Sequence, residues 1–515
     1  MKYSALHLGL LGALVLGVVL VRLTAIPAED AVMLYEYAKN LASQGVITYG
    51  AKNTVPVEGA TDFLWMICIA ILAKAGLNEY SAALGITVVA TVLLFQLLVA
   101  RGIPSLLVGA SIATSGYFVS ALHGFSTIAF SALYVLCLAL AARKDRRTYF
   151  AVLFLCLLRP DGVVWAAGVL AMVLLSVNRS ELRGHLRDLI LFLVIPGAIY
   201  FVWRVSYFGE WLPLSFLVKA AGARDLLIFY RYSLASVEWA AVPLVVTLVA
   251  ASAPRGLLLR ALLLFVLPAI FYGAMRLEQN TGNRFLAPMF FGGLFLVSQY
   301  GRTRALVAFV LLSAYLAWFQ PYIGTLDTVK SLANSRRENV YSVARDLGSL
   351  QGKMLVTEAG RLAYYSGWQV DDSWGLNTPR FARRLIDTAD LVAGQYDLIS
   401  AHCELSLLTA APAPKPDRSR SWENHCAVLV DYIRNNDYEV VLVPFYRGLT
   451  LGQKIRTHLN VAYEFVPDQC ERYDIFAISH SYSDLERILA LLMAHGAQPY
   501  AQVKQKIVGD SLCSH

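Results

Sequence analysis

The chain has 515 residues, of which 57% are hydrophobic and 16% are charged, and its formal net charge is +8. Its mean hydropathy is +0.54. This composition excludes an ordinary soluble globular protein and indicates a polytopic α-helical membrane protein. The basic residues gather in short loops between apolar runs and form no tract interleaved with aromatic residues. The positive charge therefore reflects membrane topology, and we expect no nucleic-acid partner.

Apolar runs of near-membrane length predict about eleven transmembrane helices. Most runs are apolar all round rather than along one stripe, which distinguishes spans from buried core helices. The expected spans are about 4–26, 81–100, 105–122, 125–142, 147–158, 162–177, 188–207, 237–251, 258–275, 285–300 and 303–320. The shorter run 63–77 is interpreted as an interfacial or re-entrant helix. The alternative, that 63–77 spans the membrane, would place the basic cluster Arg143–Arg147 outside.

The Lys and Arg residues of the short loops predict the orientation, because such loops stay on the cytoplasmic side. The loops expected inside contain Arg101, Arg143–Arg147, Arg179, Arg183, Arg187, Arg255, Arg260, Arg302 and Arg304. With Lys2 also inside, eleven crossings leave the C-terminal part outside. The run 4–26 is interpreted as a retained anchor and not as a cleaved signal peptide, since its basic region is thin and Pro27 follows it.

The composition becomes more polar beyond Gln320-Pro321. Short runs rich in β-forming residues alternate there with helical patterns, which predicts a small extracytoplasmic α/β domain. The runs are Met354–Thr357, Tyr396–Ser400, Tyr438–Pro444 and Tyr473–Ser479. The tract Ala410–Pro416 is expected to be a surface loop. The predicted domains are 1–320, with a first outer loop at 27–80, and 321–515.

The cysteines divide by location. Cys68, Cys137 and Cys156 lie in apolar segments and are interpreted as small buried hydrophobic residues. Cys403, Cys426, Cys470 and Cys513 lie in the domain expected to be exported, where disulfides can form. Four cysteines allow three pairings, and the spacing does not choose among them. No cysteine and histidine spacing matches a zinc site, and we expect no metal centre.

Glu29 and Asp30 directly follow the first span, where the chain should leave the lipid. Two carboxylates at a helix start can simply stabilise the helix dipole. A carboxylate beside a membrane cavity is also suited to accept a proton from an attacking hydroxyl. We therefore consider both as candidate catalytic bases, with Asp30 first. Glu58, further along the same loop, is a candidate cavity-lining residue.

The segment Arg159-Pro160-Asp161-Gly162 joins two spans at the outer face. A turn explains Pro and Gly, and a structural ion pair is one interpretation of the two charges. Charges near hydrocarbon are costly, however, and usually line a water-filled cavity. Arg159 could bind a phosphate through its planar fork, with Asp161 lining the cavity.

Other polar residues are expected on the same side of the membrane. Lys219 and Arg284 are candidate phosphate ligands, and snorkelling at the interface is the alternative. Glu210 and His123 are candidate cavity-lining residues, although a histidine at a helix end is often a polar cap. In the exported domain, Asp371, Asp372 and Trp374 lie near Ala363–Gly367 and are candidates to seat an acceptor. Core packing by Trp374 and turn capping by the two Asp are the alternative.

Several of these segments together resemble the GT-C membrane glycosyltransferases. Within that superfamily the chain most resembles the polyprenyl-phosphate-dependent arabinofuranosyltransferases, such as the terminal enzyme of mycobacterial cell-wall assembly and the pilin arabinosyltransferases. The segments are the Glu29-Asp30 pair with the aromatic helix after it and Asn40-Leu41, then Val57–Trp65, Arg159–Gly162, Tyr207–Pro213, Gly282–Pro288, Ala363–Gly367 and Asp371–Leu376. The chain departs from the family pattern at Glu29, where Asp is usual, at Asp161, where Glu is commoner, and at Glu210, where Asp is commoner.

The resemblance implies an enzyme that transfers a sugar, D-arabinofuranose first, from a polyprenyl phosphate of the decaprenylphosphoryl arabinose type. The acceptor would be a hydroxyl of a cell-envelope glycan or exported protein at the outer face of the bacterial cytoplasmic membrane. No cofactor is required, and a divalent cation at Glu29 and Asp30 is compatible with the chemistry. A mannose or glucose donor is the alternative. A lipid-linked sugar transporter is a further alternative, disfavoured because the chain lacks two related halves.

Overall fold

The computed structural model describes residues 5–51, 53–221, 229–275, 277, 280–299, 303–320, 324–409, 420–445 and 473–502, without the side chains of 219–221, 229–231 and 319. The chain forms two compact units. The first comprises Met1–Ala31, Thr61–Trp211 and Arg224–Ala333, and the second comprises Val32–Ala60, Leu212–Ala223 and Asn334–His515. The division predicted near residue 320 thus lies close to the last junction, whereas two earlier segments belong with the C-terminal part.

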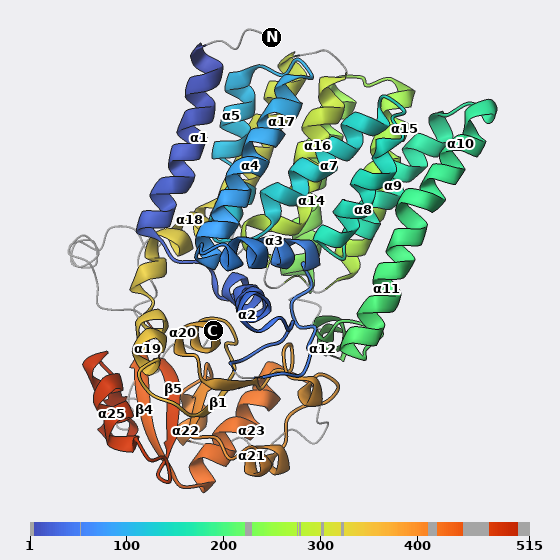
Figure 1. The fold of residues 1–515 in the computed structure, drawn as a ribbon. Helices are drawn as coiled ribbons and strands as arrows, with labels where there is room; N and C mark the ends of the chain where they lie inside the picture. The colour runs from blue at the N-terminus through green and yellow to red at the C-terminus, as the bar shows by residue number, and fades with distance from the viewer. Residues whose placement is uncertain are drawn as a thin grey trace, which may run out of the picture. The chain divides into compact units, whose positions relative to one another are not determined.

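Helices make up the first unit (Figure 1). They are α1 (Ala5–Thr24), α3 (Phe63–Lys74), α4 (Glu79–Val99), α5 (Ser105–Ala113), α6 (Gly116–Leu122), α7 (Thr127–Ala141), α8 (Arg147–Leu158), α9 (Gly162–Ser176), α10 (Arg179–Leu189), α11 (Ile195–Phe208), α14 (Ala235–Ala250), α15 (Arg255–Ala274), α16 (Ala287–Ser298), α17 (Thr303–Phe319) and α18 (Thr325–Asn334). Each predicted span overlaps one or two of them.

Five helical segments of the described chain are long and apolar enough to cross a membrane: Ala5–Thr24, Glu79–Val99, Arg179–Phe208, Tyr232–Ala250 and Arg255–Ala274. The helices α5 and α6 make a sixth if they form one span, which is then bent by 61°. Shorter apolar helices, including α7, α8 and α9, occupy other predicted spans. The number of crossings and the orientation stay predictions.

Two features of the first unit bear on topology. The run predicted at 63–77 forms the 12-residue helix α3, shorter than a bilayer requires. The predicted span at 188–207 is part of a continuous 30-residue helical segment, Arg179–Phe208. Its middle is the π-helical stretch Ile190–Val194. It ends at Gly209, whose φ of +73° is a left-handed conformation that glycine adopts readily.

The second unit contains a six-stranded sheet with the order β2-β1-β3-β5-β4-β6. Its strands are β1 (Lys353–Val356), β2 (Gln369–Asp372), β3 (Leu398–Ala401), β4 (Tyr438–Pro444), β5 (Tyr473–Ser479) and β6 (Gln498–Pro499). The strand β1 pairs in parallel with β2 and β3, and the remaining pairs are antiparallel. The four predicted strand runs are confirmed, whereas β2 and β6 were not expected.

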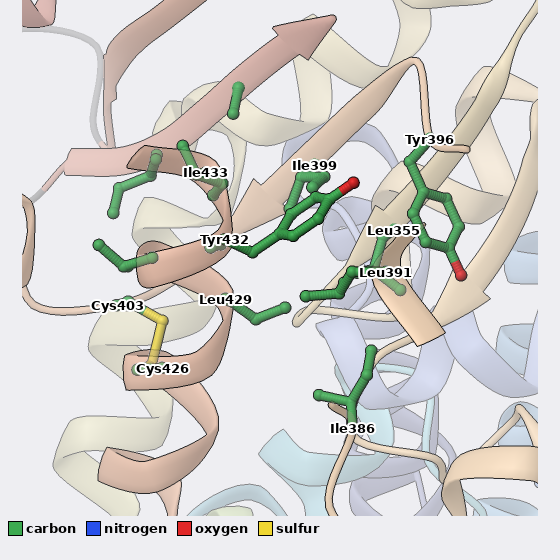
Figure 2. Packing of buried hydrophobic residues seen from close by; sticks show 14 of the residues in the cluster. Leu355, Ile386, Leu391, Tyr396, Ile399, Cys403, Cys426, Leu429, Tyr432 and Ile433 are labelled. Carbon is green, nitrogen blue, oxygen red and sulfur yellow. A yellow bond between two sulfur atoms is a disulfide. The ribbon is translucent and has the colours of Figure 1, made fainter. Parts of the chain in front are cut away.

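The second unit also contains helices. The described ones are α19 (Asn339–Leu347), α20 (Arg361–Ser366), α21 (Thr388–Gly394), α22 (Ser406–Thr409), α23 (Trp422–Asn435) and α25 (Leu485–Ala494), together with α12 (Leu214–Ala221). Apolar residues of α23, including Leu429, Tyr432 and Ile433, meet Leu355 and Ile399 of the sheet in one buried cluster (Figure 2). Burial of such side chains from both layers stabilises the domain.

A disulfide joins Cys403 to Cys426 within this cluster (Figure 2). This bond pairs two of the four cysteines whose pairing the sequence left open. Cys470, Cys513 and the tract Ala410–Pro416 lie outside the described residues. Cys137 is buried as expected, while Cys68 and Cys156 are partly buried.

The helix α2 (Glu29–Gln44) begins in the first unit and continues in the second. Its later residues attach to the α/β domain: the Tyr37 hydroxyl donates to Asn377 Oδ1 at 2.9 Å, and Lys39 Nζ donates to the Tyr364 carbonyl at 2.9 Å. The Tyr49 hydroxyl likewise donates to the Ala359 carbonyl at 2.6 Å. The first outer loop is therefore part of the α/β domain from Val32 to Ala60, which composition alone did not indicate.

Candidate functional site

Asp30 and Arg284 form an ion pair in the first unit. Arg284 Nη2 donates to Asp30 Oδ2 at 3.3 Å. The Arg284 side chain is 10% exposed and that of Asp30 is 35% exposed. A buried cation is thus paired with a carboxylate that remains accessible. The structure brings together the first-choice base and one of the predicted phosphate ligands.

A tight turn before α16 positions Arg284. Gly282 and Asn283 both have positive φ, +63° and +55°. At Gly282 a Cβ would lie 2.4 Å from the Gly116 carbonyl oxygen, so this position requires glycine. Asn280 fixes the turn by donating to Asn283 Oδ1 at 2.8 Å and accepting from the Phe285 amide at 3.1 Å. These bonds stabilise the turn that immediately precedes Arg284.

The Arg284 guanidinium lies against aromatic rings. Its Cζ is 3.8 Å from the centre of the Phe125 ring and 5.1 Å from that of Phe285. Such stacking compensates part of the cost of burying the cation. Nη1 is nevertheless buried without a hydrogen-bond partner among the described residues. An unsatisfied donor on a buried cation is costly and is suited to an anionic ligand.

Arg159 and Asp161 form a second pair with two parallel hydrogen bonds. Arg159 Nε donates to Asp161 Oδ1 at 3.0 Å, and Nη2 donates to Oδ2 at 2.6 Å. Asp161 is the N-cap residue of α9, yet its side chain makes no capping bond. It also accepts a short hydrogen bond from the Tyr272 hydroxyl, which in turn accepts from Trp165 Nε1 at 3.1 Å. The pair is therefore held by residues of α9 and α15.

One ring, Phe285, connects the two pairs. Arg159 Cζ lies 4.8 Å from the centre of this ring, and Tyr272 stacks on it at 6.0 Å between centroids. Because Arg284 contacts the same ring, the two guanidinium groups lie close together. Two converging cations can bind a phosphate and stabilise the charge that develops on it.

The two ion pairs, Asp30 with Arg284 and Arg159 with Asp161, form an arginine cluster. A third carboxylate, that of Asp62, lies near it. The sequence did not indicate Asp62 as a site residue. Asp62 Oδ2 accepts from the Ser126 hydroxyl at 2.6 Å. Burial raises the pKa of the Asp62 carboxyl, while the charge of Arg159, the Ser126 hydrogen bond and the charge of Arg284 lower it. A single polar residue before an apolar helix was the only signal available in the sequence.

The other predicted residues of the membrane part lie in different settings. His123 is buried, with Nε2 3.1 Å from the Thr328 carbonyl oxygen, and its own carbonyl accepts from the Ala28 amide at 3.0 Å. Glu29 is the first residue of α2. Glu210 lies in the loop after α11, where Arg204 donates to the Trp211 carbonyl at 3.0 Å.

Two more predicted residues belong to the second unit. Glu58 is buried, and its carbonyl accepts from the Leu214 amide at 3.1 Å. Lys219 is on α12, and its side chain lies outside the described atoms. Phosphate binding by Lys219 and cavity lining by Glu58, Glu210 and His123 stay predictions.

The three candidate acceptor residues participate in structural contacts of the α/β domain. Asp372 is fully buried and accepts from the amides of Trp374, Gly375 and Asn377 and from Asn377 Nδ2, at 2.9 to 3.2 Å. Burial raises the pKa of its carboxyl to about 6, and these donors lower it. Through Asn377, Asp372 supports Tyr37 of α2.

Asp371 and Trp374 have equally well-defined partners. Asp371 Oδ2 accepts from Arg380 Nη2 at 2.5 Å and from the Tyr396 hydroxyl at 2.9 Å. The Trp374 ring lies edge-on to His425 at 5.1 Å between centroids. These contacts agree with the alternative of turn capping and core packing, and acceptor binding by the three residues stays a prediction.

No group of three or more His, Cys, Asp or Glu side chains within the described ranges has the arrangement of a metal site. Asp30, Asp62 and Asp161 are instead bonded to Arg284, Ser126 and Arg159, respectively.

The sequence matches no protein-family model and no curated protein. Two crystal structures of ArnT from Cupriavidus metallidurans are similar to this structure at 12% identity. The structure bound to undecaprenyl phosphate has a TM-score of 0.52 and covers 78% of this chain and 94% of its own. The apo structure has a TM-score of 0.54, with coverage of 91% and 97%. The likeness confirms the predicted fold, a polytopic helical membrane protein with a C-terminal α/β domain.

Proposed function

We propose that the protein is a glycosyltransferase that moves a sugar from a polyprenyl phosphate to an acceptor hydroxyl. The observation that carries this proposal is the pair of guanidinium groups, Arg159 and Arg284, on the Phe285 ring beside the accessible carboxylate of Asp30. The buried Nη1 of Arg284 is suited to a phosphate oxygen. The shared fold adds support, because one ArnT structure contains undecaprenyl phosphate.

The reaction forms a bond between the acceptor oxygen and the anomeric carbon of the sugar and breaks the bond from that carbon to the phosphate oxygen. The leaving group is a polyprenyl phosphate, on which negative charge develops. Arg159 and Arg284, with Lys219 as a further candidate, stabilise this charge. Asp30 takes the proton of the acceptor hydroxyl, and Glu29 is the alternative base. No redox cofactor or nucleotide is needed.

The sugar proposed first is D-arabinofuranose, on the resemblance of the sequence segments, and mannose or glucose is the alternative. The acceptor is a hydroxyl of a cell-envelope glycan or an exported protein. We place this chemistry at the outer face of the bacterial cytoplasmic membrane. The Cys403–Cys426 disulfide supports that side, because disulfides persist in oxidising compartments.

Mass spectrometry of lipid-linked sugars in a strain lacking the protein tests this proposal. The expected result is accumulation of one polyprenyl-phosphate sugar, reversed by the wild-type gene but not by the Asp30→Asn variant. The mass and linkage analysis of the accumulated sugar then identify it as pentose or hexose. An unchanged lipid-linked sugar pool, together with no transfer by the purified protein from pentose or hexose donors, would overturn the proposal.

A further inference from the structure

Asp62 occupies the N-cap position of α3 but does not cap it. Aspartate is among the preferred N-cap residues because its carboxylate usually accepts a hydrogen bond from the first helical amides. The Asp62 side chain makes no such bond. It turns instead to Ser126, the N-cap residue of α7, whose hydroxyl donates to Oδ2 at 2.6 Å. The carboxylate is thus directed away from its own helix.

Ser126 places this carboxylate in the arginine cluster. The residue before Ser126 is Phe125, whose ring lies under the Arg284 guanidinium at 3.8 Å. Phe130, on the first turn of the same helix α7, lies 4.8 Å from Arg159 Cζ. The loop and helix start that hold Asp62 therefore also contact both arginines.

The charges of the cluster leave Asp62 without a cation of its own. Arg284 pairs with Asp30, and Arg159 pairs with Asp161 through two bonds. Asp62 has a salt bridge to none of the described cations, and Ser126 is the one described partner of its carboxylate. The favourable influence of Arg159 and Arg284 on its charge is exerted at longer range. A third carboxylate would oppose the binding of phosphate, so a role in holding phosphate is excluded.

We propose that Asp62 is a substrate-binding residue that accepts hydrogen bonds from hydroxyl groups of the transferred sugar. This inference rests on the proposed function. One oxygen, Oδ2, is fixed by Ser126, and Oδ1 has no hydrogen-bond partner in the described part of the chain. A carboxylate is an acceptor only, and hydrogen bonds from hydroxyls to a charged acceptor are strong. Placed beside the phosphate-binding arginines, it lies where the sugar of a phosphate-linked donor begins.

Comparison of two lipids tests this role. One is the polyprenyl phosphate without a sugar, and the other is the same lipid carrying the sugar identified by mass spectrometry. For Asp62→Asn, the affinity for bare polyprenyl phosphate should be unchanged or higher, because a negative charge near the phosphate is removed. Affinity for the sugar-bearing lipid should fall roughly tenfold relative to the affinity for bare polyprenyl phosphate, as expected for a lost charge-assisted hydrogen bond.

Two further variants complete the experiment. Ser126→Ala should change the ratio of the two affinities in the same direction but less, since it removes only the bond that orients Asp62. Asp145→Asn, which alters a carboxylate paired with Arg147 outside the cluster, should leave the ratio unchanged. Thermal unfolding of each detergent-solubilised variant controls for folding.

The outcomes separate the two proposals. An unchanged ratio for Asp62→Asn in a folded protein, or an equal loss for both lipids, overturns the role of Asp62 alone. Failure of the wild-type protein to bind either lipid overturns the proposed function and the role of Asp62 together.

Discussion

Asp30 and Arg284 are 254 residues apart in the chain, yet Asp30 Oδ2 lies 3.3 Å from Arg284 Nη2. The pair links the start of α2 to the turn before α16. An accessible base candidate is thereby held beside a buried cation whose Nη1 still needs a partner. In the proposed reaction, this pair places the candidate base next to the phosphate of the donor.

Replacement of Arg284 should weaken donor binding. Arg284→Ala removes a charge-assisted hydrogen bond of about 1.5–3 kcal/mol, which corresponds to a loss of affinity of roughly 10- to 100-fold. Arg284→Lys should retain part of the affinity, because it keeps the charge but not the planar fork. Binding of polyprenyl phosphate in detergent measures this, with Arg147→Ala as the control. Wild-type affinity in both Arg284 variants would show that the residue is structural.

The hydroxyl of Tyr272 should contribute to the rate of sugar transfer through its hydrogen bond to Asp161. Tyr272→Phe removes the bond to Asp161 and keeps the stacking on Phe285. We expect transfer to slow by about 5- to 100-fold, the equivalent of roughly 1–3 kcal/mol. Tyr134→Phe is a matched control, because the buried Tyr134 hydroxyl has no hydrogen-bond partner among the described residues. Equal effects of the two substitutions on initial rate would refute a specific role for Tyr272.

The Cys403–Cys426 disulfide should stabilise the α/β domain. The two cysteines are separated by 23 residues, and closing a loop of this length in the unfolded chain is worth roughly 3 kcal/mol. The double variant Cys403→Ser with Cys426→Ser should unfold at a lower temperature in detergent. Mass spectrometry should find that the two cysteines react with an alkylating reagent only after reduction. Free thiols at both positions in protein taken from the native membrane would contradict export of the domain.

The buried His425 should make domain stability depend on pH. Its Nε2 lies 3.0 Å from the Ser373 hydroxyl. Burial, and to a lesser extent the charge of Arg420, lowers the pKa of His425 to about 3. The unfolded chain, with an ordinary histidine pKa near 6.5, therefore binds more protons between these two values. The stability that a neutral His425 contributes is complete above about pH 6.5 and is lost as the pH falls toward 3.

The measurement for His425 is the difference in unfolding free energy between wild type and His425→Gln. From pH 7 to pH 5 this difference should fall by about 2 kcal/mol, the linkage expected for such a pKa change. The pKa of Asp372 is raised to about 6, so this residue makes stability change with pH in the opposite direction. Because wild type and variant both contain Asp372, its effect cancels in the difference. A difference independent of pH would mean that the wild-type histidine is not shielded in the folded domain.

Much of the fold could be predicted from the local sequence pattern. Apolar runs gave the helices because a run of near-membrane length has few other stable states, and four of the six strands followed from β-forming residues. The four-residue β2 (Gln369–Asp372) contains two aspartates and lacked that signal. The attachment of Val32–Ala60 to the α/β domain depends on contacts such as Tyr37 with Asn377, which are distant in sequence.

The site was only partly accessible to the same reasoning. Asp30, Arg159, Asp161 and Arg284 were recognisable as charges at the ends of apolar runs, where burial demands a partner. The sequence did not indicate which charges pair. Asp62 resembled an ordinary N-cap, and Tyr272 resembled an ordinary residue of an apolar helix. The roles proposed for them rest on hydrogen bonds to Ser126 and Asp161, which only the folded chain brings close.

The most direct measurement follows both products of the reaction with purified protein. Polyprenyl phosphate carrying a labelled sugar is incubated with an acceptor glycan, and labelled acceptor and released polyprenyl phosphate are quantified together. We predict equal amounts of the two for wild type and for Glu29→Gln, and neither for Asp30→Asn, which should still bind donor. Release of polyprenyl phosphate without labelled acceptor, or full transfer by Asp30→Asn, would contradict a site in which Asp30 activates the acceptor beside Arg284.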